Sequence, residues 1–240
     1  MSKESPQLTD SVVMVKPTHF GYNFETGVDN LFQSLPDAPE EIVRVRANSE
    51  FNEMVEKLVQ NDLRVVVLES PVGPEGGLTP DAIFPNNWFS THPECLVFYP
   101  MKAQNRRWER QPEVLQSALT GINVLYPETI DLTKDELNGQ VLEGTGSLVL
   151  DRPNRIAYAL GSQRTSEAEL KKWSQIMNYE PHFFHAVDFG DNPVYHTNVV
   201  MSVGDNFAVV CTDAIKDANE REAVVRRLVE SGKTVSEITM

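Results

Sequence analysis

The chain has 240 residues, of which 40% are hydrophobic and 23% charged, and its formal net charge is -14. A chain of this length and composition can bury a large core, which excludes an intrinsically disordered protein. The negative charge repels phosphate backbones and anionic lipid headgroups, so we expect neither a nucleic-acid partner nor a membrane partner.

The N-terminal residues and the cysteines set two further expectations. The first residues, MSKESP, lack the apolar segment of a secretory signal, and no apolar run approaches the roughly 20 residues that span a bilayer. We therefore expect a cytoplasmic protein. Cys95 and Cys211 are too few for a disulfide scaffold and have no zinc-ligand spacing, so we expect no structural metal.

The first predicted unit is the least regular. Apolar and β-branched residues predict strands at 12–15, 42–45 and 64–68, with a helix at 49–60 before the last of them. Residues 20–39 show no periodicity and are expected to be irregular.

The second predicted unit repeats this order. We expect a strand at 82–84, a loop at 85–93, a strand at 95–99, a helix at about 109–119 and a strand at 122–125.

The third predicted unit follows the same pattern. An apolar run at 141–150 predicts a strand, 151–154 a turn and 156–160 a second strand. A helix is expected to begin near Ser166, because Glu169 stands three residues later as in a capping box. Apolar residues at helical spacing continue this helix: Leu170, Trp173 and Met177.

In the fourth predicted unit, strands at 197–203 and 207–211 flank a tight turn, a helix at about 217–231 follows, and 237–240 resembles a last strand. Four successive strand-strand-helix-strand units indicate a cyclic repeat architecture, in which each unit buries its apolar face against its neighbours.

Polar residues occupy corresponding places in three of these units. Asp81, Glu143 and His196 stand where the first strand of each unit begins. In a ring of repeats such positions meet at the central axis. We therefore expect these three residues to face one small cavity.

Three segments carry a resemblance to a known family. Residues 79–88 (TPDAIFPNNW), 142–147 (LEGTGS) and 195–199 (YHTNV) resemble the signature segments of the guanidino-group-modifying enzymes, which include arginine deiminases, dimethylargininases and amidinotransferases. Within that superfamily the chain is most similar to the citrulline-utilisation hydrolases. The resemblance implies a pentein-like α/β propeller of ββαβ repeats, with residues 1–240 as one catalytic domain that holds about four of the five repeats.

The resemblance also implies roles for individual residues. His196 matches the family's acid-base histidine and Glu143 the carboxylate that orients it, while Asp81 matches a carboxylate that holds the planar group of the substrate. Arginines that grip the substrate α-carboxylate are matched by Arg164 and by Arg106 or Arg107, a task that suits a guanidinium fork. No cofactor is implied.

Two asparagines are further candidates for substrate binding. Asn198 stands where arginine deiminases have an aspartate, and a neutral amide suits a neutral ureido group better than a cation. This departure favours citrulline over arginine. Asn87 is the other candidate, with the alternative that Asn86 and Asn87 only satisfy backbone groups of their loop.

The larger departure from the family pattern concerns the nucleophile. The family's cysteine lies near the C-terminus in a fifth repeat, whereas no cysteine follows Cys211 here. Cys211 ends an apolar strand with nothing beside it that lowers a thiol pKa. We expect the nucleophile outside this chain, in roughly 60 further residues that would complete the ring; the other interpretation is a protein that has lost its chemistry.

The expected function is hydrolysis of a C–N bond in citrulline or a related arginine derivative through a covalent thiol intermediate. The alternatives are a dimethylargininase, an amidinotransferase and a non-catalytic binder of arginine-like amino acids. The expected partner is a small amino acid, and a homodimer stays open. Simpler interpretations also stay open: a strand histidine satisfied by a neighbour, a turn aspartate at 81, and a solvated helix start for Arg106 and Arg107.

Overall fold

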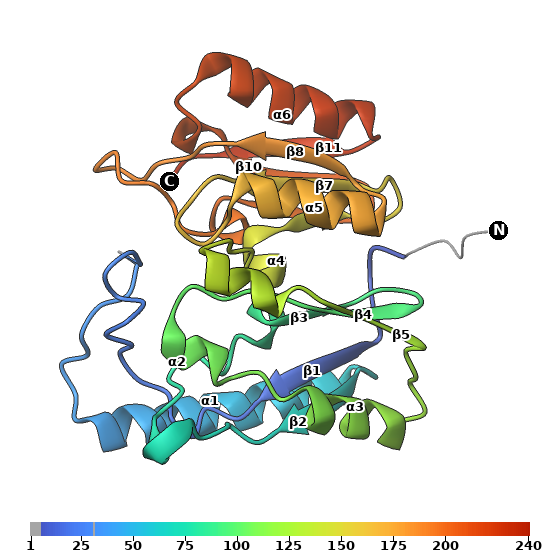
Figure 1. Cartoon of the computed structure of the whole chain (residues 1–240). Coiled ribbons are helices and arrows are strands. Elements are labelled where there is room, and N and C mark those ends of the chain that lie inside the picture. Colours follow the sequence, from blue (N-terminus) through green and yellow to red (C-terminus); the bar gives the residue numbers. More distant parts are fainter. Residues whose placement is uncertain (1–5, 31) are drawn as a thin grey trace.

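The computed structural model describes residues 6–30 and 32–240, which form four small sheets stacked in chain order (Figure 1). The first sheet pairs β1 (Ser11–Val15) in parallel with β2 (Arg64–Leu68), and α1 (Glu40–Gln60) connects them. The strand predicted at 42–45 is wrong, because those residues belong to α1. Glu40 and Glu41 stabilise the start of this helix, since acidic side chains complement the positive end of its dipole.

The second sheet has the order β3-β4-β5, antiparallel and then parallel. The strand predicted at 82–84 is wrong: this part of the chain turns, and Pro85 begins a short helical turn before β3. The strand predicted at 122–125 is wrong as well, because Asn123 takes a positive φ of 60° at the end of α3 and reverses the chain. The elements are β3 (Phe89–Thr91), β4 (Cys95–Phe98), α2 (Gln104–Arg107), α3 (Pro112–Gly121) and β5 (Glu128–Asp131).

The third sheet, β6-β7-β8, has the same pattern. The run at 141–150 is a strand only at its end, since residues 144–147 form the short helix α4. The predicted cap is confirmed, because Ser166 Oγ accepts a hydrogen bond from the Glu169 backbone N–H at 3.3 Å. The elements are α4 (Gly144–Ser147), β6 (Val149–Asp151), β7 (Ile156–Leu160), α5 (Glu167–Met177) and β8 (Glu180–Phe184).

The fourth sheet, β9-β10-β11, repeats the pattern once more. The predicted strand at 197–203 is shorter than expected, since a helical turn at Thr197–Val199 precedes it. The helix predicted at 217–231 is confirmed, with Asp217 as its N-cap. The elements are β9 (Met201–Val203), β10 (Phe207–Cys211), α6 (Ala218–Glu230) and β11 (Thr234–Ile238).

Three apolar cores hold the four units together, one between each pair of neighbours. The first joins β1 and β2 to β3 and β4 around Trp88. The second joins the sheets of the second and third units around Trp173, and the last joins those of the third and fourth around Tyr158 and Phe184. The fold is therefore a mixed α/β array of small sheets, and the propeller arrangement stays a prediction. Among the described helices, none combines the length and apolar character that crossing a bilayer requires.

Candidate active site

Three short helical turns from different units meet at the centre of the molecule. Asp81, Glu143 and His196 each precede one of these turns, and each turn leads into the first strand of its unit: Pro85–Asn87 into β3, α4 into β6 and Thr197–Val199 into β9. Helix α4 contacts the other two turns. Their approach requires glycine, because a Cβ on Gly146 would lie 2.3 Å from Asn87 Nδ2 and 2.7 Å from the His196 ring.

The closest contact in this centre is between His196 and Glu143. His196 Nε2 lies 2.9 Å from Glu143 Oε2, and the Lys102 backbone N–H donates to Glu143 Oε1 at 3.0 Å. Both side chains are buried. Guanidinium nitrogens of Arg106 and Arg164 lie 3.8 and 3.7 Å from Glu143 Oε2.

These surroundings determine the charges of the pair. Burial would raise the pKa of Glu143, but His196 and the two guanidinium groups outweigh it and hold the pKa at about 2. Burial, with help from Arg164 and Arg106, lowers the pKa of His196 below its ordinary value despite the carboxylate. A neutral imidazole that donates its Nε2–H to an ionised carboxylate keeps a lone pair on Nδ1, so His196 is suited to act as a general base.

Arg106, on α2 of the second unit, lies beside Glu143. Glu109 accepts from Arg106 at two atoms, Nε at 3.0 Å and Nη2 at 2.9 Å, and Asn87 Oδ1 accepts from Nη1 at 2.7 Å. Arg106 Nε also lies 3.9 Å from Asp81 Oδ2. Arg106 is 2% exposed, so the interpretation of this residue as part of a solvated helix start is wrong.

Arg107 is not brought to the centre. Its Nε donates to the Met101 carbonyl oxygen at 2.9 Å, and it forms an ion pair with Glu136 at 3.5 Å. These contacts turn its guanidinium away from the cavity. Of the two alternative arginines, the structure places Arg106 at the site.

The centre encloses a cavity of about 120 Å³. Most residues expected from the sequence line it, and Glu143 lies behind His196. The cavity also has lining residues that sequence reasoning did not select; Asn86 and Tyr195 stand inside the signature segments, whereas Asn30 lies in an irregular region with no motif. The lining residues are Asn30, Asp81, Phe84, Asn86, Asn87, Arg106, Arg164, Tyr195, His196 and Asn198.

Residues 20–30, which we call the covering segment, lie over this cavity. Asn23 Nδ2 and Thr26 Oγ1 donate to Asp81 Oδ2 at 2.8 and 2.9 Å. Asp29 forms an ion pair with Arg164. Sequence reasoning left this region irregular and missed all three side chains.

Neither cysteine lies at the cavity. Cys95 belongs to the core between the second and third units, and Cys211 to the core between the third and fourth. Burial and the nearby Asp213 carboxylate raise the pKa of Cys211 to about 11, so its thiol stays protonated at neutral pH. The described residues also contain no cluster of three or more potential His, Cys, Asp or Glu metal ligands.

Together these groups provide a base backed by a buried carboxylate, a second carboxylate at Asp81, and neutral amides around one small cavity. The family model for eukaryotic N,N dimethylarginine dimethylhydrolases matches residues 16–240. The chain belongs to this family. A search of curated proteins found no match.

Solved structures of guanidino-modifying enzymes share the fold. The N-terminal domain of ArgZ, a cyanobacterial arginine dihydrolase, superimposes in its substrate-bound form with a TM-score of 0.68 at 17% identity, over 95% of this chain and 75% of that one. AgrE with L-arginine gives 0.68 at 17% identity, over 96% of this chain and 31% of that one. A dimethylarginine dimethylaminohydrolase adduct gives 0.60 at 14% identity, over 95% and 75%. The chain spans about a third of ArgZ and of AgrE, 31% of each.

Proposed function

We propose that the protein is a hydrolase that cleaves a C–N bond in the ureido or guanidino group of a small amino acid. The observation that carries this proposal is the buried His196–Glu143 pair, 2.9 Å apart, with its neutral imidazole at the cavity. Membership of the dimethylarginine dimethylhydrolase family supports it. We infer further that the four units are blades of a pentein-like propeller.

In the proposed reaction His196 moves one proton between successive partners. Its Nδ1 takes the proton of a cysteine thiol, and the thiolate attacks the planar carbon of the substrate. The imidazolium, stabilised by Glu143, gives that proton to the departing amine. The planar carbon stays bound to sulfur as a thioester-like intermediate. Nδ1 then takes a proton from water; hydroxide displaces the thiolate, which recovers the proton. With citrulline the released carbamate loses carbon dioxide, so the products are ornithine, ammonia and carbon dioxide.

Citrulline is our preferred substrate because of the amides at the cavity. Asn86, Asn87 and Asn198 line it with neutral amides, which fit a neutral ureido group better than a cation. A cationic guanidinium would find carboxylate charge mainly on Asp81 and on Glu143, which is already paired. Dimethylarginine is the second candidate, favoured by the family match.

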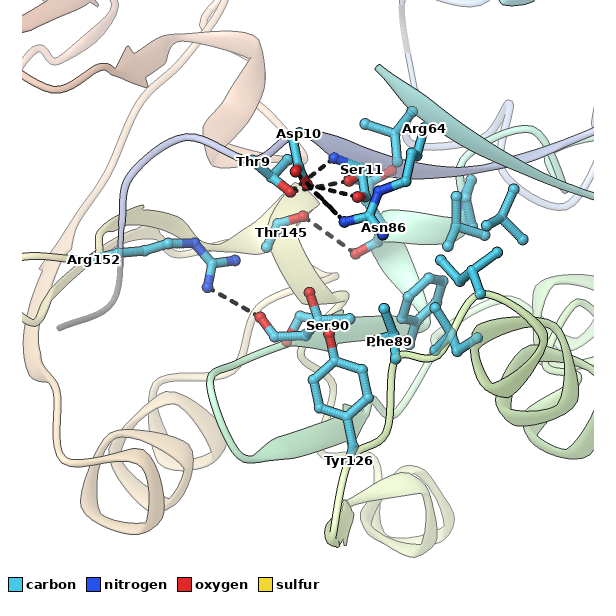
Figure 2. Close-up of a pocket in the computed structure, with 18 of the residues that line it drawn as sticks. Thr9, Asp10, Ser11, Arg64, Asn86, Phe89, Ser90, Tyr126, Thr145 and Arg152 are labelled. Atoms are coloured by element: carbon cyan, nitrogen blue, oxygen red, sulfur yellow. Dashed lines mark hydrogen bonds and ion pairs between the residues drawn. The ribbon is translucent and has the colours of Figure 1, made fainter. Parts of the chain in front are cut away.

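We also infer that the thiol comes from a segment outside residues 1–240, because Cys95 and Cys211 lie in cores away from the cavity. A groove beside β1 supports this inference (Figure 2). In the described part of the chain β1 pairs only with β2, whereas β4, β7 and β10 each have an antiparallel neighbour as well. The groove measures about 540 Å³ and shares Asn86 with the cavity. A strand that pairs with β1 there would bring the residue before it towards His196.

Product analysis tests the proposal on a form of the protein that contains the nucleophile. We expect ammonia and ornithine from citrulline, whereas release of methylamines from methylated arginines would favour the second candidate. In H196A turnover should fall by about 10² to 10⁴, because the proton carrier is lost. An unchanged rate in H196A would refute the assignment, and calorimetric binding of citrulline without turnover in the unsubstituted protein would favour a binder.

A further inference from the structure

The carboxylate of Asp29 is bound to Arg164, the side chain that the α-carboxylate of the proposed substrate needs. Arg164 lines the cavity, and its Nη2 donates to Asp29 Oδ1 and, at 3.1 Å, to the Thr26 carbonyl oxygen. Lys102 Nζ donates to Asp29 Oδ2 at 2.6 Å. The two cations outweigh burial and lower the pKa of Asp29, which keeps it ionised. An α-carboxylate that enters the cavity therefore meets an arginine already neutralised by an internal acid.

The same contacts hold the covering segment over both sides of the cavity. Asn23 and Thr26 bind Asp81 of the second unit, while Asp29 binds Arg164 of the third. Tyr195 of the fourth unit lies under the Arg164 guanidinium, whose Cζ is 4.7 Å from the ring centroid. The position of Arg164 is thus defined by the segment on one side and by an aromatic ring on the other.

The cavity under the segment is too small for an amino acid of the size of citrulline. Its volume is about 120 Å³, whereas ligand pockets usually begin near about 300 Å³. A second cavity of about 340 Å³ shares Asn30, Asp81, Phe84 and Tyr195 with the first. Movement of the segment would join the two spaces, so substrate entry requires that its contacts break.

We propose that Asp29 is an internal substitute for the substrate α-carboxylate, which displaces it from Arg164 and thereby releases the covering segment. This inference rests on the proposed function in so far as the ligand is an α-amino acid. The exchange conserves charge around Arg164, because one carboxylate replaces another at Nη2 while Glu143 stays beside Nη1. Without such a ligand, opening the segment would take the hydrogen-bonded carboxylate from a buried guanidinium and leave it only Glu143, at 3.7 Å, which is unfavourable.

Binding to the 240-residue chain tests this idea without any chemistry. The probes are L-citrulline and L-norvaline, an amino acid with a carboxylate but no ureido group, and affinities are measured by calorimetry. In D29N both should bind about tenfold more tightly or better, because the competing charge-assisted hydrogen bond is lost. If Asp29 merely positioned Arg164, D29N should bind both amino acids more weakly. Weaker or unchanged binding in D29N would overturn the proposal.

Glu25→Gln is the matched control. Glu25 belongs to the same segment and binds the Asn105 backbone N–H at 3.1 Å, so E25Q removes a charge without touching Arg164. Its affinities should stay within about twofold. Equal tightening in E25Q would show that general loosening of the segment, and not competition, is responsible.

Amide hydrogen exchange gives the second readout. Residues 20–30 should be protected in the ligand-free chain, exchange faster when L-norvaline is added, and exchange fast in D29N without ligand. If L-norvaline leaves the protection of residues 20–30 unchanged, the proposed displacement of Asp29 by the ligand carboxylate is wrong. If D29N tightens binding, but a form of the protein that contains the nucleophile fails to hydrolyse citrulline, this inference is supported and the proposed function is rejected.

Discussion

Asn198 stands exposed at the rim of the cavity, two residues after His196. Because its amide is neutral, it offers no Coulomb attraction to a guanidinium. In N198D a carboxylate would face the substrate, and we expect the ratio of kcat/KM for arginine over citrulline to rise by about threefold to tenfold, as for a solvent-exposed charge pair. Steady-state kinetics with both substrates measures this ratio.

The control carries the same change of charge at a distant exposed position. N219D lies in the first turn of α6 and should leave the ratio unaltered. A ratio that N198D fails to raise would mean that residue 198 does not sense substrate charge.

The residues at the centre were the most predictable part of the site. Asp81, Glu143 and His196 were expected to converge because they recur at equivalent positions of repeated units, and the structure brings them together around Arg106. Asp29 was not predictable. It belongs to an irregular region, and its partner Arg164 lies 135 positions away, so no local pattern indicates the contact.

The points at which the helices of the third and fourth units begin follow from their N-cap residues. Asp217 Oδ1 accepts hydrogen bonds from the backbone N–H groups of Asn219 and Glu220 at 2.8 and 2.9 Å. D217A leaves both donors without this partner, so the free energy of unfolding should fall by about 1 kcal/mol. Denaturant titration of the two proteins measures the difference.

Glu222→Ala serves as the comparison for this helix. Glu222 is on the exposed surface of α6, and its one ion pair with the described residues is a long one, with Arg226 at 3.8 Å. Its removal should change the free energy of unfolding by less than about 0.5 kcal/mol. Equal losses in D217A and E222A would argue that the cap has no special role.

Elements beside the candidate site differed from their predictions for a common reason. Residues 144–147 and 197–199 continue apolar runs that favour strands, yet they form helical turns. The turns are stabilised by contacts with one another across units, and such contacts are not encoded in local periodicity. Likewise the β-branched run at 42–45 joins α1, because the helix as a whole overrides local strand preference.

For the whole molecule, buried histidines should make stability depend on pH. Burial, with Arg152 and Arg155, lowers the pKa of His92 to about 3, and the pKa of His196 is lowered as well. In the unfolded chain histidine titrates near its ordinary value of 6.5. The unfolded state therefore binds more protons below that value, and stability contributed by the neutral side chains is complete above pH 6.5 and is lost as the pH falls towards 3.

His92→Gln isolates this effect. Between pH 7 and pH 5 the His92 contribution should fall by about 2 kcal/mol, and H92Q should lack that part of the decline even if its stability at pH 7 is lower. Thermal unfolding followed across this range gives both slopes. Parallel slopes for the two proteins would show that His92 is not held neutral in the fold.

Lys102 contacts the candidate site through its backbone and through its side chain. Its backbone N–H binds Glu143, whereas its side chain reaches Asp29. Any residue other than proline at this position retains the backbone contact with Glu143, while the choice of side chain alters the contacts with Asp29 and Gln163. Position 102 therefore offers a place where evolution or an engineer could tune the proposed entry of the ligand while leaving the His196–Glu143 pair in place.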